Sequence, residues 1–185
     1  ASRFTETDCC LTVAIAFSPP EAHSLFAGLA TPGTRLVGVQ DKDIGGCLSQ
    51  ALDAMFHSGY SKVLALGSDS PSLPIGYLKQ AFASLDTHEL VFGPALDGGY
   101  TLVGMRRLYP EIFTGIDWSS AQVLEQSLQR ASTLKLTTTL ISGWYDIDTI
   151  ADLERLQAEL AFLPAPQLTH TRQFLHGWQA GNHKF

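Results

Sequence analysis

The sequence predicts an α/β fold with a mostly parallel, mixed sheet. Short apolar runs alternate along the chain with longer segments of helical periodicity, which is typical of successive βαβ units. One run, Lys62–Leu66, is apolar after its first residue, as in a strand at the centre of a parallel sheet that is covered on both faces. Two further runs, Glu89–Phe92 and Tyr100–Met105, are separated by only a few residues. This close ββ step predicts one antiparallel strand.

The apolar runs predict six strands and the periodic segments predict the helices between them. The expected strands are Leu11–Phe17, Leu36–Val39, Lys62–Leu66, Glu89–Phe92, Tyr100–Met105 and Leu134–Ile141. The expected helices are Pro20–Ala27, Ile44–His57, Pro74–Leu85, one turn at Tyr109–Phe113, a helix from Ser120 to about Ala131, Ile150 to about Leu160, and Leu168–Trp178.

Residues at the ends of these segments support the assignment. Pro19 and Pro20 suit a first helical turn, and Gly59 ends the second helix. The pair Ser119-Ser120 is expected to cap one helix, and Asp148-Thr149 is expected to cap the next.

The pattern predicts one domain over residues 1–163 and a helical tail over residues 164–185. Pro164 and Pro166 interrupt the periodicity between them. The tail carries Phe174, Leu175 and Trp178. These apolar residues fit a homodimer contact, and they fit packing onto the core of the same chain equally well.

The composition is that of a folded protein. Of 185 residues, 45% are hydrophobic and 16% charged, and the net charge of −6 with scattered Lys and Arg argues against a nucleic-acid partner. No apolar run approaches the ~20 residues of a membrane span, and the first residues do not resemble a signal peptide. Three cysteines form no disulfide framework, which favours a reducing, cytoplasmic setting.

Two smaller observations leave alternatives open. Cys9-Cys10 fits two small apolar residues entering a buried strand, or a metal or redox role. The histidines lack the spacing of a zinc site. The sequence begins at Ala1 without an initiator Met, so the N-terminus is expected to be processed, tagged or truncated.

The segment Gly67-Ser68-Asp69-Ser70-Pro71 follows a buried strand and presents a carboxylate at its end. Ligands of open α/β sheets bind outside the carboxyl ends of the strands. A carboxylate there suits a hard divalent cation such as Mg²⁺ or Mn²⁺, which prefers oxygen ligands. The alternative is that Asp69 caps the following helix or turn.

A second segment, Gly93–Tyr100, contains Asp97-Gly98-Gly99 between two expected strands. Paired glycines allow positive φ angles or a close approach of the backbone to a ligand. The segment is therefore either a tight turn between strands or a loop that presents Asp97 and backbone N–H groups to a substrate.

Two further segments carry polar and aromatic candidates. Asp146 and Asp148 lie between a strand and a helix; they would point to opposite sides of an extended segment, so only one is expected to face the site. Asp148 is also a candidate N-cap. Trp118 is either an aromatic wall of a pocket or a core residue. Gly45-Gly46 is either an anion-binding helix start or an ordinary one.

Taken together, these segments resemble a bacterial family of glycosyltransferases with the GT-A, nucleotide-diphospho-sugar transferase fold, a three-layer sandwich. Members are associated with radical-SAM and selenoprotein gene clusters, and some with arsenosugar biosynthesis. The resemblance rests on Gln40 with the Asp-x-x-x-Gly region that follows it, Gly67–Pro71, Gly93–Tyr100 with Leu102 and Gly104, Trp118-Ser119, and Tyr145–Thr149 with Asp152-Leu153.

The resemblance implies a reaction and a site. The chain would transfer a sugar from a nucleotide-diphosphate donor to a small acceptor, with Mg²⁺ or Mn²⁺ held by Asp69 and by Asp148 or Asp146. Asp97 would be the general base or would position the acceptor. The remaining residues implied to contact nucleotide or substrate are Gln40, Gly67, Ser68, Pro71, Gly98, Gly99, Tyr100 and Trp118.

The chain departs from the resemblance at its N-terminus. Family members usually begin with a strand and a phosphate-contacting loop rich in Pro, Gly, Lys, Thr and Arg, and no such loop precedes Leu11. Two other functions stay open. One is nucleotidyl transfer to a phosphorylated small molecule, as in related guanylyltransferases, and the other is a non-catalytic remnant that binds a partner or metabolite.

Overall fold

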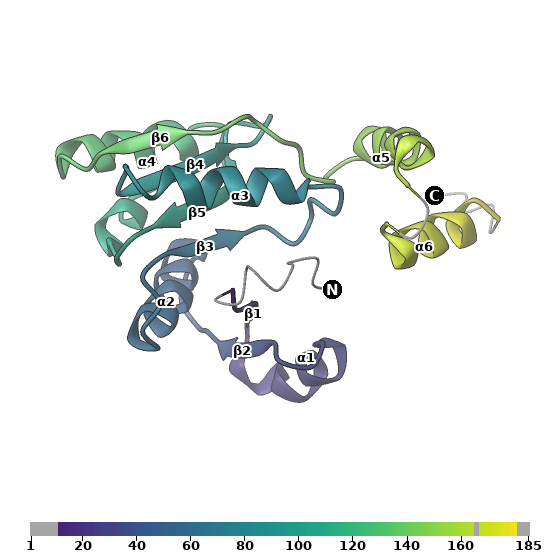
Figure 1. The fold of residues 1–185 in the computed structure, drawn as a ribbon, viewed down its shortest axis with the longest axis horizontal. Coiled ribbons are helices and arrows are strands. Elements are labelled where there is room, and N and C mark those ends of the chain that lie inside the picture. The colour runs from purple at the N-terminus through teal and green to yellow at the C-terminus, as the bar shows by residue number, and fades with distance from the viewer. Residues whose placement is uncertain (1–10, 165–166, 181–185) are drawn as a thin grey trace.

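A computed structural model of the chain describes residues 11–164 and 167–180 (Figure 1). Its strands are β1 (Ala14–Phe17), β2 (Arg35–Gly38), β3 (Val63–Leu66), β4 (Leu90–Pro94), β5 (Tyr100–Met105) and β6 (Thr138–Leu140). Its helices are η2 (Pro20–Ala22), α1 (His23–Leu29), α2 (Ile44–His57), α3 (Ile75–Ser84), η3 (Pro110–Phe113), α4 (Val123–Thr133), α5 (Ile150–Phe162) and α6 (Thr169–Ala180).

Four strands form a mixed sheet in the order β3-β5-β4-β6. β5 pairs antiparallel with both β3 and β4, whereas β4 and β6 pair in parallel. β3, β4 and β6 therefore run in one direction, and their carboxyl ends meet at one edge of the sheet. The predicted single antiparallel strand is confirmed as β5, which follows β4 after a five-residue turn.

β3 corrects one prediction. It was expected at the centre of a parallel sheet, but it is an outer strand of the four-stranded sheet and pairs antiparallel with β5. Leu66, at its end, is 42% exposed. An apolar run indicates that both faces of a strand are covered. It does not indicate whether the strand is paired with other strands on one side or on both.

β1 and β2 form a separate, parallel two-stranded sheet, so the described strands make two sheets where the sequence indicated one. α2 contacts both β2 and β3 and so bridges the two sheets. Tyr60 precedes β3 and Thr12 precedes β1, and the Tyr60 hydroxyl donates a hydrogen bond to Thr12 Oγ1 at 2.7 Å. A helix and side chains thus join the sheets, in place of a shared hydrogen-bond ladder.

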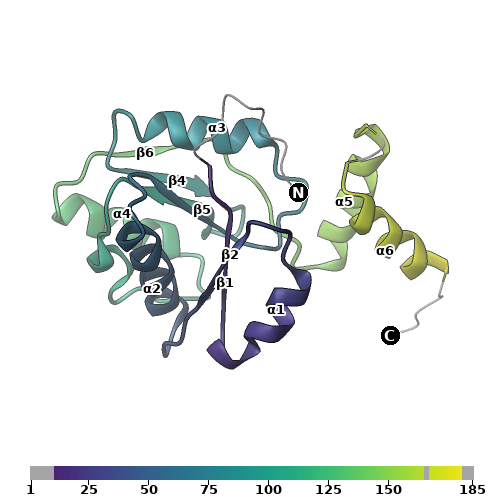
Figure 2. The same cartoon turned by 60° about the horizontal axis from the view of Figure 1, so that its bottom comes forward.

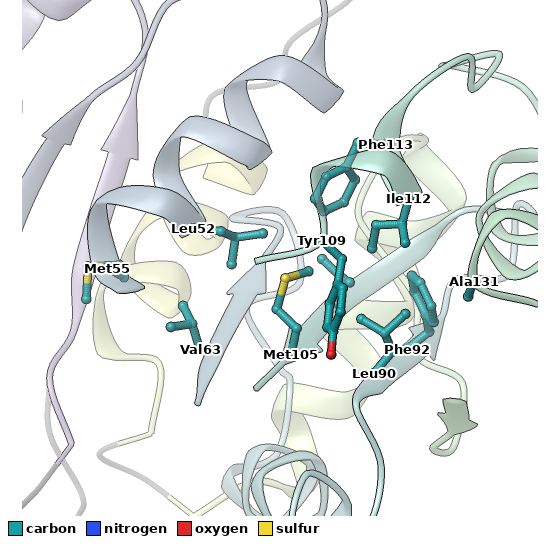
Figure 3. Close-up of a cluster of buried hydrophobic side chains, with 11 residues drawn as sticks. Leu52, Met55, Val63, Leu90, Phe92, Met105, Tyr109, Ile112, Phe113 and Ala131 are labelled. Carbon is teal, nitrogen blue, oxygen red and sulfur yellow. The ribbon is translucent and has the colours of Figure 1, made fainter. Parts of the chain in front are cut away.

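The four-stranded sheet is covered on both faces. On one face, α2, η3 and α4 pack in a cluster that includes Leu52, Phe92, Met105 and Ile112 (Figure 3). On the other, α3 packs through residues such as Tyr77 against Val91 and Leu102 of the strands. This arrangement gives the α/β/α layering that the resemblance implied around this sheet.

Several helix and strand boundaries differ from the prediction. α4 begins three residues after Ser120, and its N-cap is Gln122. Ser119 has a φ of 65°, and the Ser120 hydroxyl donates to the carbonyl of Asp117 at 2.7 Å, which closes a turn before the helix. The pair therefore forms this turn and does not cap α4. β6 is shorter than its apolar run, because only residues 138–140 pair with β4.

α5 and α6 form a helical pair beside the sheet (Figures 1 and 2). They pack on one another through Leu156, Leu160 and Leu175. Leu175 is thus a core residue of this pair, whereas Phe174 is 67% exposed. Every described helix is too short or too polar to cross a membrane. Cys9 and Cys10 lie outside the described residues.

Candidate active site

Three loops leave the carboxyl ends of the parallel strands. Residues 67–74 follow β3, residues 95–99 join β4 to β5, and residues 141–149 follow β6. They carry four aspartates that the sequence singles out: Asp69, Asp97, Asp146 and Asp148. The strand order therefore brings residues nearly eighty positions apart in sequence to one edge of the sheet, where ligands of open α/β folds bind.

Asp97, Asp146 and Asp148 form a compact cluster. One carboxylate oxygen from each lies within 4.8 Å of those from the other two. Asp146 is half-buried, and the other two are exposed. The prediction that only one of Asp146 and Asp148 would face the site is wrong. Residues 145–148 have no regular secondary structure, so the alternation of an extended strand does not apply to them.

The negative charges influence one another. Burial raises the pKa of the Asp146 carboxyl, and the charges of Asp97, Asp148 and Asp69 raise it further. Crowded carboxylates disfavour their own ionisation unless a cation lies between them. The oxygen-only donor set and its spacing fit a hard divalent ion such as Mg²⁺ or Mn²⁺.

Asp69 lies outside this three-residue cluster but close enough to affect Asp146 electrostatically. Its backbone carbonyl accepts a hydrogen bond from Ile147 N–H at 3.0 Å. The N-cap of α3 is Pro74, so Asp69 does not cap that helix. A Cβ at Gly67 would lie 2.5 Å from Asp69 Oδ1. Glycine at position 67 therefore allows the exposed carboxylate to fold back along the loop.

Comparison with known proteins places the chain in a family. The profile of a family described as an uncharacterized protein conserved in bacteria, DUF2064, matches residues 3–120. The chain belongs to DUF2064. The matched residues include Asp69 and Asp97 and end before Asp146 and Asp148. No curated protein matches the chain.

A solved structure supports the fold of this DUF2064 member. It is a provisionally assigned nucleotide-diphospho-sugar transferase from Desulfovibrio desulfuricans G20, with 29% sequence identity and a TM-score of 0.74. The match covers 80% of this chain and 67% of the other. The implied α/β transferase-like fold is therefore confirmed in outline, with mixed sheets.

The Asp97-Gly98-Gly99 segment of the DUF2064 chain is a tight turn, and it carries one carboxylate of the acidic cluster. Asp97 Oδ1 accepts the Gly99 N–H at 2.9 Å. Gly98 has a φ of +95°, and a Cβ there would overlap the carbonyl oxygen of Ala121. The Gly98 carbonyl accepts Leu124 N–H at 3.0 Å. The glycines therefore serve to dock this turn against the start of α4, which fixes the position of Asp97.

Tyr100, directly after that turn, and Trp118 pack against the core cluster drawn in Figure 3. Their ring centroids are 6.5 Å apart, and Tyr100 also contacts Phe92. Burial raises the pKa of Tyr100, whose hydroxyl has no hydrogen-bond partner, and the Trp118 Nε1 is likewise buried and unpaired. Their role as walls of an acceptor pocket stays a prediction.

Gln40 lies after β2, at the approach to α2. Its backbone N–H and carbonyl both bond to the side chain of Gln50. The start of α2 is capped by Asp43, which accepts Gly46 N–H at 2.8 Å, and a Cβ at Gly46 would overlap the Asp41 carboxylate. Two carboxylates therefore face this helix start, which argues against the anion site considered for Gly45-Gly46.

Ser68 and Pro71 lie in the loop after β3, where Ser68 is exposed and Pro71 half-buried. Their predicted contacts with a nucleotide remain predictions. Sequence reasoning missed the residues that hold the loops together: the Ser70 hydroxyl donates to the Tyr145 carbonyl at 2.9 Å, and the Ser72 hydroxyl donates to the Tyr145 hydroxyl at 3.3 Å. No local pattern links positions so distant in sequence.

Proposed function

We propose that this DUF2064 chain is a metal-dependent glycosyltransferase that moves a sugar from a nucleotide-diphosphate donor to a small acceptor. The observation that carries the proposal is the cluster of Asp97, Asp146 and Asp148 at the carboxyl ends of the strands. The likeness to a provisionally assigned nucleotide-diphospho-sugar transferase supports the substrate class by analogy. Function on a shared fold depends on the site, so the cluster weighs more than the fold.

The three aspartates would hold Mg²⁺ or Mn²⁺. Such an ion would supply Lewis-acid stabilisation of the negative charge that develops on a departing nucleoside diphosphate. The chain's own contribution is positional. The Asp97 turn is docked on α4, and the Asp146 segment is bonded to the loop after β3, so the two ligand-bearing loops are held at one edge of the sheet.

The geometry favours an exchange of roles between two aspartates. The resemblance implied Asp69 as the chief metal ligand and Asp97 as the base. Asp97 lies in the three-carboxylate cluster and Asp69 lies outside it. A carboxylate whose charge is engaged by a cation is a weak base. We therefore assign Asp97 to the metal and the exposed Asp69 to positioning or deprotonating the acceptor, a base being needed only if the transfer inverts configuration.

Substitutions test the metal role. Asp97→Asn, Asp146→Asn and Asp148→Asn are each expected to weaken Mn²⁺ binding by at least about tenfold, or ~1.4 kcal/mol, in titration calorimetry. Asp53→Asn, in a half-exposed aspartate of α2 outside the cluster, is the matched control and is expected to leave Mn²⁺ binding unchanged. Unchanged Mn²⁺ affinity in all three cluster variants would refute the metal site.

Asp69→Asn separates the two assigned roles. It is expected to leave Mn²⁺ binding within about threefold of the wild type, because Asp69 is outside the cluster, and to reduce turnover strongly. If it abolishes Mn²⁺ binding while Asp97→Asn retains it, the roles are the reverse of those proposed.

Ligand and product analysis identify the reaction. Nucleotides or nucleotide sugars are expected to raise the melting temperature in thermal-shift assays run with and without Mn²⁺. A ligand that binds only the folded state stabilises that state. Release of a nucleoside diphosphate supports glycosyl transfer, and release of pyrophosphate supports nucleotidyl transfer instead. The absence of any shift would favour the non-catalytic remnant.

A further inference from the structure

We propose that Tyr145 is a positioning residue, through which α5 holds Asp146 and Asp148 in place against the loop that follows β3. This inference rests on the proposed metal site and extends it, because it assigns a function to α5, a helix that contributes none of the clustered aspartates. Its basis is a set of contacts that converge on one buried side chain.

The hydroxyl of Tyr145 joins two elements. It donates to Glu159 Oε2 on α5 at 2.7 Å and accepts from the Ser72 hydroxyl at 3.3 Å. The residue is 2% exposed. A hydrogen bond to a charged acceptor is among the stronger neutral-donor contacts in proteins.

The ring of Tyr145 is held as well. The Arg155 guanidinium lies 3.7 Å from the ring centroid, and the Trp144 ring is stacked at 5.9 Å with an interplanar angle of 26°. Arg155 and Glu159 are one helical turn apart on α5, with 3.7 Å between Arg155 Nε and Glu159 Oε1. Two residues one turn apart on α5 therefore contact both the ring face and the hydroxyl of this tyrosine.

The backbone on either side of Tyr145 depends on these contacts. The regular pairing of this segment ends at Trp144, which forms an isolated parallel bridge with Ala95. Beyond it, the Tyr145 carbonyl accepts the Ser70 hydroxyl at 2.9 Å, and Ile147 N–H donates to the Asp69 carbonyl at 3.0 Å. No strand ladder fixes residues 145–148, so these two hydrogen bonds and the side-chain contacts of Tyr145 hold the segment.

The aspartates next to this anchor are the ones in the cluster. Asp146 immediately follows Tyr145, and Asp148 is three positions on, directly before the helix cap Thr149. A segment fixed at Tyr145 and again at the start of α5 has little freedom between the two points. Ligand geometry held by residues outside the coordination sphere commonly changes metal affinity 10–100-fold when it is lost.

Tyr145→Phe tests the proposal because it removes the hydroxyl and keeps the ring. Glu159→Gln removes the charge of its partner, and Glu154→Gln, in an exposed glutamate of the same helix, is the matched control. Mn²⁺ affinity by calorimetry or electron paramagnetic resonance is expected to fall about tenfold for Tyr145→Phe and less for Glu159→Gln, and to stay unchanged for Glu154→Gln.

A second readout needs no metal. Amide hydrogen exchange at Ile147 is expected to accelerate in Tyr145→Phe, while exchange in β4 and β5 stays at the wild-type rate. If Tyr145 only stabilises the whole fold, Tyr145→Phe would accelerate exchange throughout the chain and leave the Mn²⁺ affinity of the folded protein unchanged. Either result overturns the proposal. Failure of the wild type to bind Mn²⁺ would instead refute the metal site, and exchange at Ile147 would still decide the role of Tyr145.

Discussion

Ile147 donates its backbone N–H to the carbonyl oxygen of Asp69 at 3.0 Å. This bond joins the loop after β3 to the segment after β6, although the two strands occupy opposite ends of the four-stranded sheet. Between them, the two loops span the ends of β5 and β4. The bond thereby places Asp69 near the cluster of Asp97, Asp146 and Asp148, so the four aspartates lie in one region of the fold.

Gly98 is predicted to be essential for folding of the Asp97 turn. Gly98→Ala is expected to lower the free energy of unfolding by about 2–4 kcal/mol, because a side chain at positive φ is strained and would overlap the Ala121 carbonyl. Urea unfolding measures this. The control Gly76→Ala, where nothing lies near the new Cβ in α3, is expected to be neutral or stabilising by up to about 1 kcal/mol. Equal effects would contradict the argument.

Glu89 is predicted to stabilise the fold in a pH-dependent way. Hydrogen bonds from the Thr137 N–H and the Tyr109 hydroxyl lower the pKa of Glu89. A lowered folded-state pKa means stability that is present above the usual glutamate pKa of about 4.3 and is lost as the pH falls through the folded-state value.

Urea unfolding of wild type and Glu89→Gln checks this. The wild type is expected to be the more stable at pH 7, and the difference is expected to shrink below about pH 4.3. The exposed Glu111→Gln is the control. A difference between wild type and Glu89→Gln that is constant over this range would show that the charge of Glu89 does not contribute.

Tyr100 is predicted to tolerate the loss of its hydroxyl. The hydroxyls of Tyr100 and Ser127 are both buried and close together, but neither makes a hydrogen bond of good geometry. Removing an unpaired buried hydroxyl removes a desolvation cost. Tyr100→Phe is therefore expected to leave the free energy of unfolding unchanged or raise it by up to about 1 kcal/mol. A loss of about 1 kcal/mol, abolished in a Ser127→Ala background, would reveal a hydrogen bond between them.

The two sheets are predicted to differ in local stability. Leu90, Val91 and Phe92 of β4 are fully buried, whereas β1 is mostly half-exposed. Amides of β2 that bond to β1 are expected to exchange at least about tenfold faster than those of β4 and β5, or ~1.4 kcal/mol less protected. Hydrogen-exchange mass spectrometry measures this. Equal protection would mean that both sheets open only with the whole domain.

Local patterns sufficed for most elements. The helix α2 and the strand β5 match their predicted bounds, because helical periodicity and a run of apolar residues next to Gly and Asp are local signals. The prediction failed where contacts across the chain set the boundary, as in β6, of which only residues 138–140 pair with β4. The predicted start of α5 at Ile150 is confirmed, and Thr149 of the expected pair Asp148-Thr149 is its N-cap, with Asp152 completing a capping box. The Asp148 carboxylate is thereby left available to the acidic cluster.

Local sequence patterns are enough to show that the chain is α/β and that acidic residues follow three of its strands. Three features follow from contacts between distant residues: the strands form two sheets, Asp97 joins the cluster in place of Asp69, and Asp146 and Asp148 both belong to it. Burial and periodicity are encoded locally, whereas strand edges and irregular segments are oriented by distant partners. Tyr145 illustrates this, since its contacts on α5 and on the loop after β3 lie 14 and 73 residues away.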